Sequence, residues 1–160
     1  MSLILRLCNE KDIDIVYKMA NDSTVRENAF SGDAIPYDDH CRWYADSLAN
    51  VDRIMYIAEE RNVIVGQIRL DKQNNKAIIS YSVEKNNRKK GYGKQILRSI
   101  KREAMLNGIV MLEGLVKKRN VASRKAFVHN GFIESEEENY FRYIYLLKSG
   151  DNIEIDKNSK

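Results

Sequence analysis

The stretch VEKNNRKKGYGKQILRSIKREA, Val83–Ala104, has residues suited to anion binding. Its section Lys85–Arg102 carries eight Lys and Arg and no Asp or Glu, with Gly91 and Gly93 in the middle. An apolar pattern of helical period begins directly after the first glycine. The first turn of a helix exposes unpaired N–H groups and a partial positive charge, and glycines let a ligand approach the backbone closely. These residues therefore predict a loop that binds an anion such as phosphate.

A second segment, Gly114–Ile133, has the same charge pattern. It contains five basic residues and no acidic one: Lys117, Lys118, Arg119, Arg124 and Lys125. Together the two segments hold 13 of the 27 Lys and Arg, while all 23 Asp and Glu lie elsewhere. This segregation predicts one anion-binding surface on an otherwise acidic protein, with both segments serving the same ligand. A solvated basic face without a ligand is the alternative.

The glycine pattern excludes two common nucleotide sites. A Walker loop would end in Gly-Lys-Ser/Thr, and a dinucleotide fingerprint needs a third glycine after the first strand of a parallel unit. A lone Gly-x-Gly also suits a plain helix start. Nucleic acid is the rival anion, because clustered Lys and Arg bind phosphodiesters nonspecifically. The basic residues gather at one strand–glycine–helix junction, however, and no recognised nucleic-acid motif is present.

A mixed α/β (α+β) fold must position these residues. Apolar patterns of period 2 and period 3.6 predict strands and helices in the order βααβββαβαββ. A strand–helix–strand–helix unit after a three-strand meander requires helices on both faces of the sheet. The expected strands are Leu3–Cys8, Arg53–Glu60, Val63–Asp71, Lys76–Glu84, Ile109–Val116, Phe132–Glu138 and Tyr140–Leu147, and the expected helices begin near Asp12, Tyr37, Tyr92 and Asn120.

The composition indicates a single domain, residues 1–148, followed by a polar C-terminal tail at residues 149–160. The apolar fraction of 43% is ordinary for a globular protein. No apolar run is long enough to span a bilayer and no signal-like segment is present, so we expect a cytoplasmic protein without a membrane partner. Cys8 and Cys41 lack metal spacing and are expected to be reduced thiols, and no metal site is predicted.

Two motifs resemble those of the GNAT family of N-acetyltransferases. Arg88–Gly93 is similar to the family's Arg/Gln-x-x-Gly-x-Gly/Ala signature, and the preceding strand Ile79–Glu84 resembles the family's fourth strand. Asn120–Phe132 looks like the family's Asn-x-x-Ala/Ser…Gly-Phe segment at matching spacing. The order of elements resembles the family over Leu3–Leu147. It implies a mixed, mostly antiparallel sheet of about seven strands flanked by four helices.

The resemblance implies that acetyl-CoA is the cofactor. Backbone N–H groups of the loop would cradle its pyrophosphate, and the surplus cations would face its phosphates. Asn120 would contact the pantetheine arm or cap a helix, or do both. A backbone N–H near Val83, where the fourth and fifth strands splay apart, would polarise the thioester carbonyl. The implied cofactor-binding residues are Val83, Arg88, Lys89, Lys90, Gly91, Tyr92, Gly93, Lys94, Asn120, Arg124 and Lys125.

The catalytic pattern of the family is incomplete in this sequence. Acetyl transfer needs a route for the amine proton and a proton for the leaving thiolate. Ile78 and Ile79 occupy strand positions where the family often has Glu, and Phe127 stands where its frequent acid, a Tyr, would be. Histidine is the side-chain type whose ordinary pKa suits proton transfer near neutrality, so His40 is the predicted base, directly or through water, although a lone helix histidine more often has a structural role. The other protic candidates are Ser80, Tyr81, Ser82 and His129.

The segment Asn21–Tyr44 has a narrower resemblance, to acetyltransferases that act on nucleotide-linked amino sugars of the pseudaminic-acid type. The implied acceptor-binding residues, next to His40, are Arg26, Asn28, Phe30, Ser31, Trp43 and Tyr81. The predicted function is acetyl-CoA-dependent acetylation of a primary amine on such a sugar, and a homodimer is left open. The alternatives are acetylation of a protein N-terminus or lysine, and a non-catalytic module that binds acetyl-CoA or nucleic acid. An ordinary inter-helix loop would explain Phe30 and Trp43 equally well.

Overall fold

The computed structural model describes residues 3–148, and the expected tail at 149–160 lies outside the described residues. The elements of this range are β1 (Leu3–Leu7), α1 (Ile13–Asn21), α2 (Ser23–Asn28), α3 (Tyr37–Ala49), β2 (Arg53–Glu60), β3 (Val63–Gln73), β4 (Lys76–Val83), α4 (Tyr92–Leu106), β5 (Met111–Lys117), α5 (Val121–His129), β6 (Ile133–Glu136) and β7 (Tyr140–Leu146). No helix between residues 3 and 148 combines the length and apolar character that crossing a bilayer requires.

The strands form one seven-stranded sheet in the order β1-β2-β3-β4-β5-β7-β6. β4 and β5 are parallel, whereas every other neighbouring pair is antiparallel. The parallel pair is connected through α4, because parallel neighbours need a long crossover. This arrangement confirms the predicted α+β fold with a mixed, mostly antiparallel sheet.

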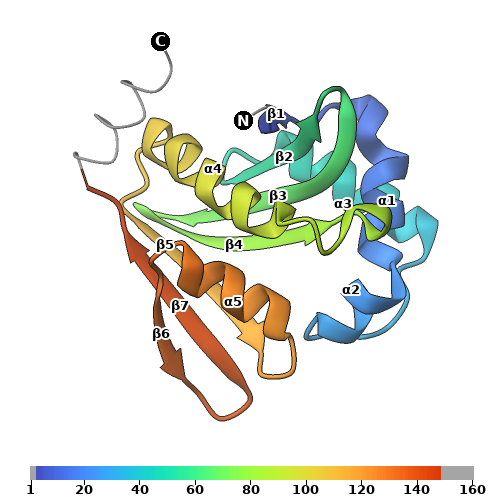
Figure 1. Cartoon of the computed structure of the whole chain (residues 1–160). Helices are drawn as coiled ribbons and strands as arrows, with labels where there is room; N and C mark the ends of the chain where they lie inside the picture. Colours follow the sequence, from blue (N-terminus) through green and yellow to red (C-terminus); the bar gives the residue numbers. More distant parts are fainter. Residues whose placement is uncertain (1–2, 149–160) are drawn as a thin grey trace.

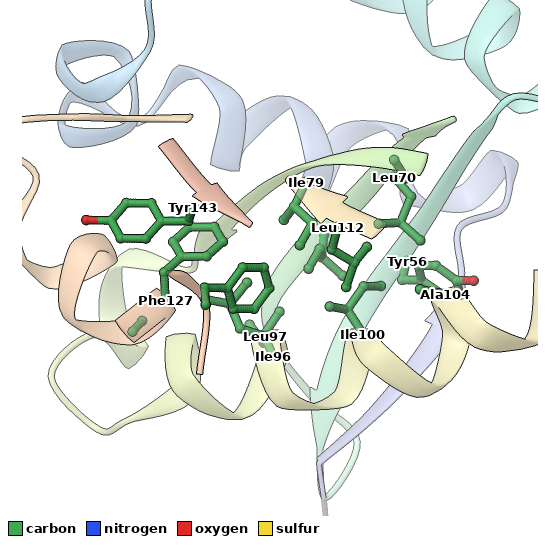
Figure 2. Close-up of a cluster of buried hydrophobic side chains, with 14 of the residues drawn as sticks. Tyr56, Leu70, Ile79, Ile96, Leu97, Ile100, Ala104, Leu112, Phe127 and Tyr143 are labelled. Carbon is green, nitrogen blue, oxygen red and sulfur yellow. The ribbon is translucent and has the colours of Figure 1, made fainter. Parts of the chain in front are cut away.

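Helices cover both faces of the sheet, α4 and α5 on one side and α1 and α3 on the other (Figure 1). The alternation along β2 shows why. Met55 and Ile57 pack with side chains of α1 and α3, whereas Tyr56 and Ala58 belong to the larger core under α4 and α5. Figure 2 shows part of this larger core, in which strand side chains meet the apolar stripe of α4: Leu70, Ile79, Ile96, Leu97, Ile100 and Leu112.

The apolar stripe on α4 determines where this helix, and with it the first turn, lies on the sheet. Ile96, Leu97, Ile100 and Ala104 recur at helical spacing, and all four are fully buried. Burial of this face holds α4 against the sheet. The first turn of α4 is thereby held just beyond the end of β4, where the basic glycine loop connects the two elements.

α2 is a helix that the sequence patterns do not predict. Its six residues have no buried side chain and no apolar stripe. The carboxylate of Asp22 caps it instead, accepting hydrogen bonds from the N–H groups of Thr24 at 3.1 Å and Val25 at 3.2 Å. The four expected helices correspond to α1, α3, α4 and α5, and α2 adds a fifth within residues 3–148.

Candidate active site

The parallel pair β4–β5 is joined over only part of its length. The last paired residues are Ile79 and Gly114, although β4 continues to Val83 and β5 to Lys117. Beyond this pair the strands separate, and the opening between them contains a cleft of about 1100 Å³. Side chains from all five helices line the cleft, so it passes from the α4–α5 face of the sheet to the α1–α3 face.

The opening leaves backbone donors on β4 without a strand partner. The N–H of Glu84 donates to the carbonyl of Val65 on β3 at 2.8 Å. Bonding directions alternate along an antiparallel strand, so the N–H groups of Tyr81 and Val83 point to the other edge of β4, from which β5 has departed. This geometry leaves the N–H of Val83 available for the carbonyl-polarising role that the family resemblance implies.

α4 begins without a side-chain cap. Gly91 occupies the cap position with a left-handed φ of 83°, and no side chain accepts a hydrogen bond from the first turn. The N–H groups of Tyr92, Gly93 and Lys94 are therefore available to a ligand. Lys89 is also left-handed, with φ 62°, so the chain curls around this helix start. The predicted anion-binding loop thus has the backbone geometry that phosphate binding requires.

Lysine side chains without partners surround the start of α4. Lys89, Lys94 and Lys125 line the cleft. Within residues 3–148, neither these three side chains nor that of Lys90 make an ion pair or a hydrogen bond. Lys90 is exposed and does not line the cleft, so its implied contact with the cofactor is the least supported of the four.

The basic residues of the second segment have different surroundings, and Arg124 lines a smaller pocket together with Lys94 and Lys125. Lys118 pairs with Glu136 at 2.9 Å. Arg124 lies outside the cleft lining; its Nη1 donates to the carbonyl of Lys118 at 3.0 Å, and its guanidinium stacks on Phe141 with Cζ 3.9 Å from the ring centroid. Of the five basic residues of this segment, Lys125 alone lines the cleft.

α2 bridges the two separated strands. At its N-terminus, Asp22 accepts a hydrogen bond from Arg88, in the loop after β4, at 2.6 Å. At its other end, the carbonyl of Glu27 accepts from Lys117 at 3.1 Å and from Arg119, both at the end of β5. Burial pushes the pKa of Asp22 upward, but the hydrogen bonds from Arg88 and the capped N–H groups outweigh it and hold that pKa below its usual range.

Arg26 holds the connection between α2 and α3 together. Its Nε donates to the carbonyl of Ala20 at 2.7 Å, and its Nη1 to those of Ser31 at 3.2 Å and Asp33 at 3.3 Å. Arg26 lines the cleft, but its donors are largely engaged with the backbone, and Ser31 does not line the cleft. These two implied acceptor contacts are therefore weaker than those of Asn28, Phe30 and Trp43, which do line it.

His40 lines the cleft but is only 2% exposed. Its Nε2 lies 2.9 Å from the carbonyl of Ile13 on α1, and the rings of Tyr17 and Tyr44 lie within 6 Å of it. A carbonyl only accepts hydrogen bonds, so Nε2 carries the hydrogen and Nδ1 is the nitrogen left to take a proton. His40 thus joins α1 to α3, and the predicted role as a base depends on Nδ1.

Tyr81 and Ser123 form a hydroxyl pair in the cleft wall. The hydroxyl of Tyr81 donates to Oγ of Ser123 on α5 at 3.0 Å. Burial raises the pKa of Tyr81 to about 12, although this hydrogen bond lowers it, so the hydroxyl is protonated at neutral pH. The ring of Phe127 lies against Gly114, where a Cβ would be 2.4 Å from Cζ. The ring of Phe127, 2% exposed, therefore fills the space that a side chain at position 114 would need.

A row of polar side chains on the α1–α3 face of the sheet includes two residues that the sequence analysis missed. Gln67 and Arg69 on β3 lie in register with Ser82 and Ser80 on β4, and all four line the cleft. The signal was present in the sequence: β3 alternates polar residues with the buried Ile68 and Leu70, although it is an internal strand with helices on both faces. Polar groups on a covered face need partners, which points to a ligand-binding role. We call these four residues the polar row.

Comparisons with known proteins identify the family of this chain. The family model described as Acetyltransferase (GNAT) domain matches residues 2–133, so the chain belongs to this family. It is a GNAT N-acetyltransferase, which confirms the enzyme class predicted from the motifs. The comparison with curated protein sequences gives no match.

Solved structures show the same fold at low identity. A spermidine N-acetyltransferase from Vibrio cholerae, in complex with CoA and spermine, has a TM-score of 0.84 at 15% identity, over 91% of this chain and 96% of that one. An aminoglycoside acetyltransferase in complex with coenzyme A has a TM-score of 0.80 at 15% identity, over 97% and 99%. A ribosomal L7/L12 α-N-protein acetyltransferase in complex with coenzyme A has a TM-score of 0.76 at 15% identity, over 92% and 95%. None of these comparisons points to nucleotide-linked amino sugars of the pseudaminic-acid type.

Proposed function

We propose that this enzyme transfers the acetyl group of acetyl-CoA to the primary amine of a small molecule, and that a nucleotide-linked amino sugar is the acceptor class to test first. The observation that carries the cofactor assignment is the uncapped start of α4 beside the β4–β5 opening. Its free N–H groups suit a pyrophosphate, and the unpaired Lys89, Lys94 and Lys125 suit further phosphate charge. The coenzyme A bound in three GNAT structures of the same fold supports the assignment.

The residues around the opening have distinct chemical roles in this proposal. Acetyl-CoA supplies an activated acetyl thioester. The N–H of Val83 orients and polarises a carbonyl placed at the free edge of β4. Tyr81 holds a proton on its hydroxyl that can pass to a leaving thiolate, and Nδ1 of His40 takes the proton of the amine, directly or through water. Asn120 lines the cleft and caps α5, its Oδ1 accepting from the N–H of Ser123 at 3.3 Å, so both implied roles are compatible.

The walls on the α1–α3 side support a small acceptor. Phe30 is 59% exposed and offers a ring on which a sugar or a base could stack, whereas the ring of Trp43 already lies against two guanidinium groups. α2, bound at both ends, restricts the width of the opening, which favours a small molecule over a folded protein. The named acceptors of the three similar structures differ in size and chemistry, so they do not select among acceptors for this chain.

A thiol-release assay with acetyl-CoA tests the proposal. The panel contains nucleotide-linked amino sugars, free amino sugars, N-terminal peptides and small amines, and we expect turnover with at least one small amine. Gly91→Glu and Gly93→Glu should abolish coenzyme A binding, because they place a carboxylate beside the first turn of α4.

Gly108→Glu is the matched control for the glycine variants. Gly108 lies beyond the other end of α4, with φ 73° and, like Gly91, nothing within 4 Å of an added Cβ. It therefore brings the same strain and charge without approaching the cleft, and coenzyme A should bind this variant as it binds the wild type. Wild-type coenzyme A affinity in both Gly91→Glu and Gly93→Glu would overturn the cofactor assignment.

A further inference from the structure

The charges that line the cleft are unbalanced. Among the described residues that line it, Asp39 is the one acidic residue, and it is paired with Arg42. The basic lining residues are Arg26, Arg69, Arg88, Lys89, Lys94 and Lys125. Arg26 and Arg88 have carbonyl or carboxylate partners, and the three lysines belong to the start of α4 and to α5. Arg69 differs from all of these, because it lies on β3 at the α1–α3 side.

Arg69 lies close to the point where the strands separate. It is in register with Ser80, which directly follows the last β4–β5 pair, Ile79 with Gly114. Neighbouring strands are about 5 Å apart, so Arg69 is one strand away from the opening. Its Cζ is 5.4 Å from the centroid of the Trp43 ring on α3. A molecule that reaches the opening from the α1–α3 side therefore passes next to this guanidinium.

The guanidinium of Arg69 is incompletely neutralised. Its Nε donates to Asp71 at 2.9 Å, but the same carboxylate accepts from Arg53 at 2.6 Å, so two cations share one anion. The remaining contact, from Nη2 to Oγ of Ser80, is long at 3.4 Å. Burial lowers the pKa of Arg69; Asp71 opposes this effect and Arg53 adds to it. The surroundings thus leave positive charge uncompensated on this side of the opening.

We propose that Arg69 selects the acceptor by binding an anionic group, a carboxylate or a phosphate, that the acceptor carries close to its amine. The inference rests on the proposed function and names the charge of its substrate. A carboxylate or a phosphate accepts parallel hydrogen bonds from a guanidinium and supplies the charge that Asp71 provides only in part. Gln67 and the two serines of the polar row add neutral hydrogen-bonding groups beside it. The same surplus charge repels polyamines and other polycationic amines.

Matched pairs of amines test this inference. One pair is glucosamine 1-phosphate with glucosamine, in which the phosphate is on the carbon next to the amine-bearing one, and the other is L-alanine with L-alaninamide. Spermidine, outside the pairs, is the polycationic amine. Wild-type kcat/KM from thiol release should favour the anionic member of at least one pair, and the pair that shows the preference identifies phosphate or carboxylate. Amine basicity differs within a pair, so the decisive quantity is the ratio of kcat/KM for the anionic member to kcat/KM for the neutral member, and how this ratio changes in Arg69→Gln. We expect the ratio to fall by roughly 10- to 100-fold, mainly through KM of the anionic member.

Arg61→Gln is the matched control. Arg61 is exposed in the turn between β2 and β3 and does not line the cleft. This variant should keep the wild-type ratio. Equal use of anionic and neutral members by the wild type, or the same fall of the ratio in both variants, overturns the inference while acetyl transfer itself stands. If the wild type binds coenzyme A but acetylates no amine, the proposed function fails and this inference fails with it.

Discussion

Replacing Gly93 by Ala should stabilise the protein and at the same time weaken its binding of coenzyme A. Gly93 is the second residue of α4 and is not left-handed. A Cβ at this position would lie 3.5 Å from Cε2 and 3.6 Å from the hydroxyl of Tyr81, and 3.8 Å from Val83, which are ordinary contacts. The protein alone therefore gives no reason for glycine here, whereas close approach of a ligand to the N–H groups does.

The two effects have opposite signs and measurable sizes. Glycine in a helix costs about 0.5–1 kcal/mol relative to alanine, so Gly93→Ala should raise Tm by roughly 1–4 °C. Loss of one charge-assisted hydrogen bond costs about 1.5–3 kcal/mol, so Kd for coenzyme A should rise by roughly 10- to 100-fold. Gly91→Ala provides the contrast: its φ of 83° is strained for alanine, and this variant should lose about 1–2 kcal/mol of stability.

Thermal unfolding without ligand and calorimetric titration with coenzyme A measure both effects on the same samples. Gly108→Ala is the control for a left-handed glycine at the far end of α4, and it should lose stability without losing affinity. A Gly93→Ala protein that gains stability and binds coenzyme A as tightly as the wild type would refute the argument. So would a variant that loses stability, since that result would mean the glycine serves the fold.

Three further outcomes follow from the structure. Phe127→Tyr adds a hydroxyl to a ring that is 2% exposed and should cost about 1–3 kcal/mol of stability without raising turnover. A stable, faster variant contradicts this expectation. His40→Gln keeps a hydrogen-bond donor for the carbonyl of Ile13 but removes the nitrogen that could accept a proton, so the variant should fold while kcat/KM falls about 10²-fold. Near-wild-type turnover from pH 6 to 9 would mean that His40 only packs between α1 and α3. Burial raises the pKa of Asp22, but Arg88 and the capped N–H groups lower it more, so this carboxylate stabilises the fold above pH of about 4 and loses that effect as the pH falls further. Asp22→Asn should therefore lower Tm at pH 7 by a few degrees and make Tm less dependent on acid pH. An unchanged Tm contradicts a stabilising role for the contact between Asp22 and Arg88.

Local patterns were sufficient for most of the fold. β2 and the start of α4 agree with the sequence expectation to the residue, because β2 contains the apolar run Ile54–Ala58 and α4 has a glycine start and an apolar stripe. α2 was not predicted because six residues cannot show a helical period, and only the capping carboxylate of Asp22 marks it. The glycine loop was likewise predictable, because its chemistry depends on neighbours in the chain.

The surroundings of individual site residues depend on contacts between distant parts of the chain. Arg124 carries charge in the sequence, but its stacking partner Phe141 is on β7, and no local pattern reveals that it lies outside the cleft. His40 looks like a free helix histidine until the carbonyl of Ile13 on α1 is placed beside its Nε2. Arg69 is the opposite case: the polar residues on an internal strand were visible, but their value depended on the register of β3 with β4.

A crystal structure of the protein with coenzyme A is the most direct test of the central claim, that the start of α4 and the β4–β5 opening together form the acetyl-CoA site. We predict the pyrophosphate against the N–H groups of Tyr92, Gly93 and Lys94, and the thiol end between the separated strands near Val83. Coenzyme A bound elsewhere on the surface, or with its phosphates away from the first turn of α4, would contradict the account.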